Sequence, residues 1–318
     1  MDREKSEKNR IEPLKGGNHM TKAKWLWAVV IFGVVLFGPP SGRAGAQEKP
    51  VIAVGSKGFT EQLILGNMIA LLAESNGFKV DRKIGLGGTV ICHEAMVRGD
   101  INVYVEYTGT GLTVILKKSV LKDPEEVYQV VKKDYEEKFK LTWLKPWGFN
   151  NTYCVVMRRS DAARLNVKRI SDLKPFAKDL IFGATIEFAA RPDGVPGLTK
   201  HYGLNFKDLK GMDPGLVYKA IAEKQVDVIS GFATDGRIPA LNLVVLEDDL
   251  KFFPPYFAAP MVRMDLLSKA PRVGDILNKM AGRISDIDMA TLNYAVDGKK
   301  IEAEIVARDY LKNNELIK

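Results

Sequence analysis

The sequence predicts an α/β fold of two lobes, each a mostly parallel sheet flanked by helices. Short runs rich in β-branched residues alternate with segments whose apolar residues recur at helical spacing, a pattern typical of βαβ units. A polar helical stretch interrupts the pattern, which then starts again. With 318 residues, 46% of them hydrophobic, the chain is long enough to divide into two cores.

Residues 1–46 are expected to be a signal peptide. Lys22 and Lys24 precede an apolar run over residues 25–37, and small residues follow it. This layout is typical of secretory signals, and the run is short for a membrane span. We therefore expect export to the periplasm of a Gram-negative cell, with an uncleaved membrane anchor as the alternative. A start at Met20 would shorten the leader.

The first half of the remaining chain alternates strands with helices. Strands are predicted over residues 51–56, 79–86 and 101–107, and helices over residues 60–77, 89–100 and 124–140. The strand runs are rich in Val and Ile, whereas the first helix has apolar residues three and four positions apart. This succession indicates a largely parallel sheet.

The second half repeats the alternation and then adds two helices. Strands are predicted over residues 152–158, 181–187, 226–233 and 243–248, with a helix over residues 215–225. A final strand over residues 258–264 leads into helices that begin at Asp275 and Asp288. We therefore expect residues 47–150 and 254–318 to form lobe 1, and residues 151–253 to form lobe 2.

Charge and cysteine content restrict the classes of function. Residues 1–46 carry eight Lys or Arg and four Asp or Glu, so their removal lowers the formal net charge from +8 to +4. Such a small charge argues against a nucleic-acid surface. The two cysteines, Cys92 and Cys154, are expected in a helix and a strand of different lobes. We therefore predict two buried thiols rather than a disulfide.

Motifs for cofactors, metals and catalysis are incomplete. The glycine cluster over residues 85–90 places Val90 where a dinucleotide loop needs a third glycine, and residues 231–237 lack the Lys-Ser/Thr end of a phosphate loop. His93 and His201 have no second ligand at helical spacing. No cofactor, metal site or catalytic residue is expected, and a monomeric binding protein is favoured over an enzyme.

Aromatic and charged residues recur at the ends of the predicted strands. They lie in the segments SKGFTEQ, EYTGT, EFAARPDG and GFATDGR. Taken singly, each residue is compatible with a core, capping or surface role. Because ligands of open α/β sheets bind beyond the carboxyl ends of the strands, their recurrence predicts a binding site.

Nine segments together resemble one known family. They are GSKGFTEQLILGNMIA, GLGGT, VYVEYTGTG, GFNNTY, EFAARPDGVPGL, QVDVI, TDGRI, VLEDD and FFPPYFAAP. Their order and spacing are similar to those of the periplasmic substrate-binding proteins of ABC importers for quaternary-ammonium osmoprotectants, such as glycine betaine, proline betaine and choline. The resemblance extends from about residue 51 to residue 311.

This resemblance implies a two-lobed type II periplasmic-binding-protein fold that closes on its ligand. The loaded protein is then recognised by an ABC permease in the inner membrane. The trimethylammonium group would lie in an aromatic cage of Tyr107, Tyr153, Phe232 and Tyr256. Ring faces suit this group because it has no N–H to donate, and each desolvated cation–π contact contributes about 2 kcal/mol.

The resemblance also assigns Lys57, Thr110 and Arg191 to the carboxylate of the ligand. Two positions depart from the family pattern. Members with a full cage often carry tyrosine where this chain has Phe232, and an acidic residue where it has Asn151. Phenylalanine keeps the π face without the hydroxyl. Asparagine removes a negative charge near the cation, which matters little if that position binds through its backbone carbonyl.

The ligand expected from these groups is a zwitterionic betaine, glycine betaine or a similar compound. Choline has no carboxylate, so it would leave Lys57 and Arg191 facing no anion. A larger betaine of the carnitine or trimethylated histidine type, or choline, is the alternative within the binding class. A ligand-sensing module for a membrane receptor and an enzyme that uses Glu106 are alternatives from other classes.

Overall fold

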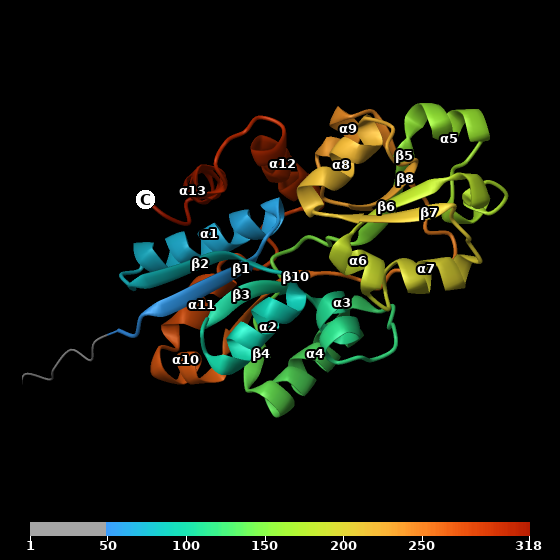
Figure 1. Cartoon of the computed structure of the whole chain (residues 1–318). Helices are drawn as coiled ribbons and strands as arrows, with labels where there is room; N and C mark the ends of the chain where they lie inside the picture. Colours follow the sequence, from blue (N-terminus) through green and yellow to red (C-terminus); the bar gives the residue numbers. More distant parts are fainter. Residues whose placement is uncertain (1–48) are drawn as a thin grey trace, which may run out of the picture. The chain divides into compact units, whose positions relative to one another are not determined.

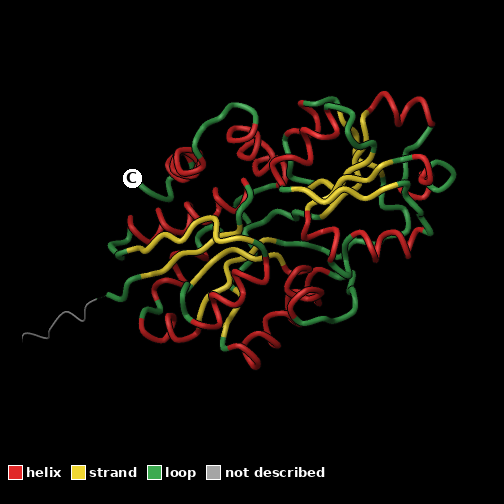
Figure 2. The backbone as a smooth tube through the Cα atoms, in the orientation of Figure 1, coloured by secondary structure: helices red, strands yellow, loops and turns green. Residues whose placement is uncertain are grey.

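A computed structural model describes residues 49–318, which form two five-stranded mixed sheets flanked by helices (Figure 1). The predicted signal peptide lies outside the described residues. Figure 2 shows the two groups of strands and the helices around each. The predicted α/β fold class is thus confirmed. Within residues 49–318, no helix is long and apolar enough to span a membrane.

The first sheet has the strand order β2-β1-β3-β10-β4. Its strands are β1 (Ile52–Lys57), β2 (Val80–Gly87), β3 (Val103–Tyr107), β4 (Leu141–Trp143) and β10 (Ala258–Arg263). β1 pairs in parallel with β2 and β3, whereas β10 is antiparallel to β3 and β4. One strand therefore runs against the other four, so the sheet is mostly parallel, as predicted.

The second sheet has the same design, with the order β7-β6-β8-β5-β9. Its strands are β5 (Tyr153–Arg158), β6 (Ile181–Thr185), β7 (Asp208–Met212), β8 (Val228–Phe232) and β9 (Leu243–Leu246). β6 is parallel to β7 and β8, whereas β5 is antiparallel to β8 and β9. The chain enters this sheet between β4 and β5 and leaves it between β9 and β10.

The helices within residues 49–318 include one at each range where the sequence predicted a helix. Those that precede β5 or follow β10 are α1 (Thr60–Ser75), α2 (Thr89–Arg98), α3 (Thr108–Thr110), α4 (Pro124–Phe139), α10 (Met264–Lys269), α11 (Arg272–Asn278), α12 (Asp286–Asp297) and α13 (Ala303–Asn313). Those between β5 and β9 are α5 (Arg159–Leu165), α6 (Ile186–Ala190), α7 (Val195–Tyr202), α8 (Pro214–Ala222) and α9 (Arg237–Ala240).

Alternation along β3 separates two apolar cores. Val103, Val105 and Tyr107 belong to the core that includes α1, whereas Tyr104 belongs to the core that includes α2 and α4. Because successive strand residues point to opposite faces, β3 is apolar on both sides. Figure 1 shows α1 and α2 on opposite sides of the strands.

The predicted strand over residues 181–187 was wrong at its end. The strand stops at Thr185, whose hydroxyl accepts a 3.0 Å hydrogen bond from the Phe188 amide and so caps α6. A side-chain cap of this kind satisfies a helix N–H and favours the turn out of the strand. Glu187 therefore lies in the first turn of a helix and not in the sheet.

The reversed strands bring residues from distant parts of the sequence to one end of each sheet. The first residue of β5, Tyr153, pairs with the last residue of β8, Phe232. In the first sheet, Ala258 at the start of β10 pairs with Tyr107 at the end of β3. An antiparallel strand begins where its neighbours end, so both kinds of residue reach the edge where ligands bind in open α/β sheets.

Candidate functional site

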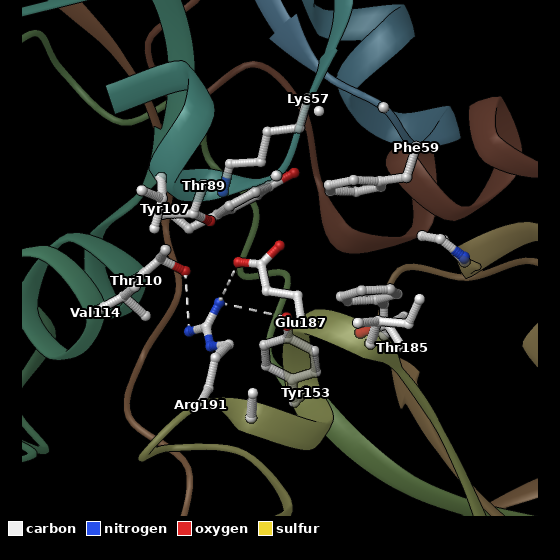
Figure 3. A pocket seen from close by; sticks show the side chains of 18 of the residues that line it. Lys57, Phe59, Thr89, Tyr107, Thr110, Val114, Tyr153, Thr185, Glu187 and Arg191 are labelled. Carbon is white, nitrogen blue, oxygen red and sulfur yellow. Dashed lines mark hydrogen bonds and ion pairs between the residues drawn. The ribbon is translucent and has the colours of Figure 1, made fainter. Parts of the chain in front are cut away.

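A cavity of about 630 Å³ lies at the strand ends of both sheets. All eight residues predicted for the binding site line it: Lys57, Tyr107, Thr110, Asn151, Tyr153, Arg191, Phe232 and Tyr256. The close-up in Figure 3 shows several of these side chains directed toward a common space. Phe59 and Glu187 also line the cavity. Neither residue was predicted from the sequence to belong to the binding site.

Five aromatic rings form one side of the cavity. The Phe232 ring stacks on Phe59 with centroids 5.5 Å apart and an interplanar angle of 2°. Tyr153 lies 4.9 Å from Phe232 and 5.5 Å from Tyr256, edge-on to the latter. Phe59 also stacks on Tyr107 at 6.4 Å. The four predicted rings are therefore joined by a fifth, whose sequence signal was an aromatic residue two positions after the end of β1.

Two tyrosine hydroxyls of this ring cluster donate to buried carboxylates. Tyr107 donates to Glu61 Oε1 at 2.7 Å, and Tyr256 donates to Asp193 Oδ2 at 2.6 Å. Hydrogen bonds to charged acceptors are the stronger kind, so these bonds fix the orientations of both rings. Phe232 lacks a hydroxyl and is held through its backbone amide, which donates to the Tyr218 hydroxyl at 3.2 Å.

Lys57 enters the cavity already paired. Its Nζ donates to Glu106 Oε1 at 2.6 Å, and it also lies 5.1 Å from the centroid of the Tyr107 ring. Glu106 is fully buried and accepts two further hydrogen bonds, from the Tyr104 hydroxyl and the Tyr107 amide. Glu106 therefore supports the local structure and neutralises Lys57, while it does not line the cavity.

Arg191 is paired as well. Its Nε and one terminal nitrogen bind the two oxygens of Asp193 at 2.8 and 2.5 Å. It also contacts Glu187 at 3.3 Å, and Thr110 and the Tyr153 hydroxyl at 3.4 Å. Burial opposes the ionisation of Asp193, but Arg191 outweighs burial and lowers the pKa of that carboxyl.

These pairs correct one expectation from the sequence. Lys57 and Arg191 were expected to face no anion unless the ligand supplied one. In the structure each has a buried carboxylate partner, Glu106 or Asp193. A ligand without a carboxylate therefore leaves no buried cation unpaired, so the sequence-based argument against choline does not hold.

The Asn151 side chain also lines the cavity. Its Nδ2 donates to Glu61 Oε1 at 2.7 Å, whereas its Oδ1 has no protein partner although the residue is buried. Its backbone amide donates to the carbonyl of Tyr256. The carboxyl group nearest to position 151 is thus that of Glu61, one hydrogen bond away.

Glu61 connects several elements through one carboxylate. Besides Tyr107 and Asn151, it accepts hydrogen bonds from the Thr234 hydroxyl at 2.6 Å and from Asn293 Nδ2 at 3.0 Å. Burial raises the pKa of this carboxyl, and the four donated hydrogen bonds oppose that shift. Sequence reasoning missed Glu61 because a helical glutamate gives no sign of its tertiary partners.

The two cysteines agree with the prediction of buried free thiols. Burial raises the pKa of the Cys92 thiol to about 12 and raises that of Cys154 further. Within residues 49–318, no three His, Cys, Asp or Glu side chains are grouped so as to hold a metal ion.

Comparisons with known proteins place these observations in a family. The family described as "Substrate binding domain of ABC-type glycine betaine transport system" matches residues 50–313. The chain is 39% identical over 273 residues to the "Carnitine transport binding protein OpuCC" of Listeria monocytogenes. The aligned residues cover 85% of this chain and 89% of that protein.

Two further relatives are similar over the same part of the chain. The "Ergothioneine transport permease/ergothioneine binding protein EgtU" of Helicobacter pylori is 37% identical over 271 residues, which are 85% of this chain and 48% of that longer protein. A structure titled "Crystal structure of glycine betaine/carnitine/choline ABC transporter" superposes with a TM-score of 0.70 at 35% identity. It covers 84% of this chain and all of that chain.

Proposed function

Because the chain belongs to the family of substrate-binding domains of ABC-type glycine betaine transport systems, we propose that its ligand is a betaine larger than glycine betaine, of the carnitine or trimethylated histidine type. The family comprises binding proteins and not enzymes, and the chain is a binding protein for betaine-type quaternary ammonium compounds in ABC import. The relatives named for carnitine and ergothioneine support the larger ligand over glycine betaine.

The observation that carries this proposal is one cavity of about 630 Å³ that holds both the ring cluster and two cationic groups. The rings suit a trimethylammonium group. Lys57 donates one of its three N–H groups to Glu106, and Arg191 Nη1 makes only contacts of 3.3 and 3.4 Å, so both retain donors for a carboxylate at the other end of the ligand. The volume falls in the range of cavities that enclose drug-sized ligands. Glycine betaine is compact and would leave much of this space to water.

We further propose that the loaded protein docks as a monomer on an ABC permease in the inner membrane. As a family member, the chain is the extracytoplasmic binding component of such an importer. Residues 1–46 would direct export to the periplasm, where the mature chain would begin near residue 47. Amino-terminal sequencing of the protein recovered from the periplasmic fraction tests this assignment, and a chain that retains residues 1–46 would contradict it.

Titration calorimetry of the purified protein tests the choice of ligand. L-carnitine, trimethylhistidine, glycine betaine and choline would be titrated under one set of conditions. We expect a larger betaine to bind with micromolar affinity, about −8 kcal/mol, and at least tenfold more tightly than glycine betaine. Glycine betaine or choline binding as tightly as both larger compounds would refute the proposed ligand class.

A further inference from the structure

Glu187 presents a carboxylate to the cavity that neither the predicted cage nor the predicted carboxylate-binding group uses. It belongs to the first turn of α6, just after the cap at Thr185 that ends β6. Both Ile186, which is 63% exposed, and Glu187 line the cavity. Figure 3 shows its carboxylate between Lys57 and Arg191, near Tyr153.

The cationic neighbours of Glu187 are committed elsewhere. Lys57 binds Glu106 at 2.6 Å and Arg191 binds Asp193 at 2.5 Å, while the contact from Arg191 to Glu187 is a longer 3.3 Å. The side chains of Glu106 and Asp193 are almost completely buried, but the side chain of Glu187 is 36% exposed. Lys57 and Arg191 are therefore neutralised by other carboxylates, and within the described chain Glu187 has only one long ion pair of its own.

Glu187 is ionised at neutral pH. Burial opposes its ionisation, but Lys57, Arg191 and hydrogen bonding from Thr89 together outweigh burial and lower the pKa of this carboxyl. An ionised carboxylate is an acceptor only, with about four lone-pair positions on its two oxygens. Arg191 makes one long contact at 3.3 Å, and the Thr89 hydroxyl and amide also favour the ionised form. The side chain is still 36% exposed and lines the cavity, so acceptor positions remain open toward it.

A second acceptor without a protein partner lines the same cavity. The Oδ1 atom of Asn151 is buried and accepts no hydrogen bond from any described residue. Buried polar atoms are nearly always hydrogen-bonded, so an unpartnered acceptor in a cavity points to a donor on the ligand. A trimethylammonium group and a carboxylate, the two ends of a betaine, both lack a donor. A ligand that supplies this donor therefore carries it between its two ends.

We propose that Glu187 binds a hydrogen-bond donor on the body of the betaine, a hydroxyl or a ring N–H, and so selects such ligands over betaines of the same length that lack one. This inference rests on the proposed function of the site. A betaine without a donor gains no hydrogen bond from this acceptor and still removes water from it, so the carboxylate favours the donor-bearing ligand over the plain one.

Two matched pairs of ligands test this selectivity by titration calorimetry on the full protein. L-carnitine and γ-butyrobetaine differ by one hydroxyl. Trimethylhistidine carries a ring N–H, whereas trimethylphenylalanine has a benzene ring of similar size without one. In the wild type we expect the donor-bearing member of at least one pair to bind at least tenfold more tightly, which corresponds to about 1.4 kcal/mol.

Two variants remove the acceptor in steps. Glu187→Met, which keeps similar length but cannot accept strongly, should reduce the ratio within that pair to less than threefold. Glu187→Gln, which keeps one acceptor oxygen without the charge, should give an intermediate ratio. The control is Glu94→Gln, an exposed glutamate on α2, which should leave the ratio unchanged. Thermal unfolding of each variant checks that the fold is retained.

The outcomes separate this inference from the function on which it rests. If all four betaines bind with the same ratios in the wild type and in Glu187→Met, the selectivity role is refuted and the proposed function stands. An equal loss of affinity for all four in Glu187→Met would also refute it, because Glu187 would then only position Arg191. If the wild type binds none of the four, both proposals fail.

Discussion

The hydroxyl of Tyr107 donates a 2.7 Å hydrogen bond to the carboxylate of Glu61. Tyr107 ends β3 of the first sheet, whereas Thr234, which donates to the same carboxylate, follows β8 of the second sheet. One buried side chain on α1 thus links a ring of the cavity to the strand ends of both sheets. The orientation of the Tyr107 ring and the packing around α1 depend on the same hydrogen bonds.

We predict that Glu61→Gln destabilises the protein. The amide has one acceptor oxygen where the carboxylate has two, so at least one of the four donors loses its partner. Leaving a buried donor unsatisfied costs about 1–3 kcal/mol. Urea denaturation measures the loss. The control is Glu74→Gln on the same helix, an exposed partner of Arg82, which should cost less than about 1 kcal/mol. A Glu61→Gln variant as stable as the wild type would contradict the network.

The pH dependence of stability should also report on Glu61. Its pKa is higher in the folded chain than the ordinary value of 4.5, so the folded state binds the proton more tightly. This contribution to stability is fully present below pH 4.5 and is lost as the pH rises through the higher, folded pKa. The difference in unfolding free energy between wild type and Glu61→Gln should therefore fall as the pH rises above 4.5. A difference that does not change between pH 4 and 8 would argue against a raised pKa.

The pair of Arg191 and Asp193 should show strong coupling. Arg191→Met alone leaves the buried Asp193 carboxylate without its cation, a change that costs about 3–5 kcal/mol in buried pairs. Replacing both residues, as Arg191→Met with Asp193→Asn, should recover at least half of that loss because no buried charge remains unpaired. A double-mutant cycle by denaturation measures the coupling. Additive effects of the two changes would mean that the pair is not coupled.

Phe59 should contribute to ligand affinity although its role was not predicted. Phe59→Leu keeps an apolar side chain but removes the ring face that lies against Phe232. We expect betaine affinity to fall about tenfold or more, since one desolvated cation–π contact contributes about 2 kcal/mol. Phe206→Leu is the control, because that ring packs on Phe182 and does not line the cavity. Equal affinities of Phe59→Leu and wild type would exclude this ring from the cage.

The thiols should be unreactive in the folded protein. Cys92 and Cys154 are buried and free, and burial raises both pKa values, so almost no thiolate is present at neutral pH. Ellman's reagent should modify neither thiol in the native state, and both after unfolding in urea. Rapid modification of either thiol without denaturant would contradict the described packing.

The sequence predicted the alternation of strands and helices and the residues at the strand ends. Tyr107 ends one predicted strand and Phe232 is the second-last residue of another, and the rule that ligands bind at that edge needs only the order of elements. The pairing of Lys57 with Glu106 was not predicted, because it depends on β1 and β3 being neighbours in the sheet. These residues are far apart in the sequence, and no local pattern indicates the register.

Glu187 shows why part of the site could not be predicted from the sequence. Its segment, IFGATIE, has the β-branched and apolar character of a strand, and in a longer strand this side chain would have had a place in the sheet. The Thr185 cap ends the strand earlier and starts a helix. A shift of two residues at one strand end therefore decides that the cavity contains an additional carboxylate.

The measurement that tests the proposed cage most directly compares the tightest-binding betaine with its carbon analogue, in which an uncharged tert-butyl group replaces the trimethylammonium group and the carboxylate is kept. The two groups have the same shape, so the comparison isolates the charge that the rings are proposed to bind. If the cage acts through cation–π contacts, calorimetry should show at least hundredfold tighter binding of the betaine, about 2.8 kcal/mol. Equal affinities for the two compounds would contradict the proposed cage.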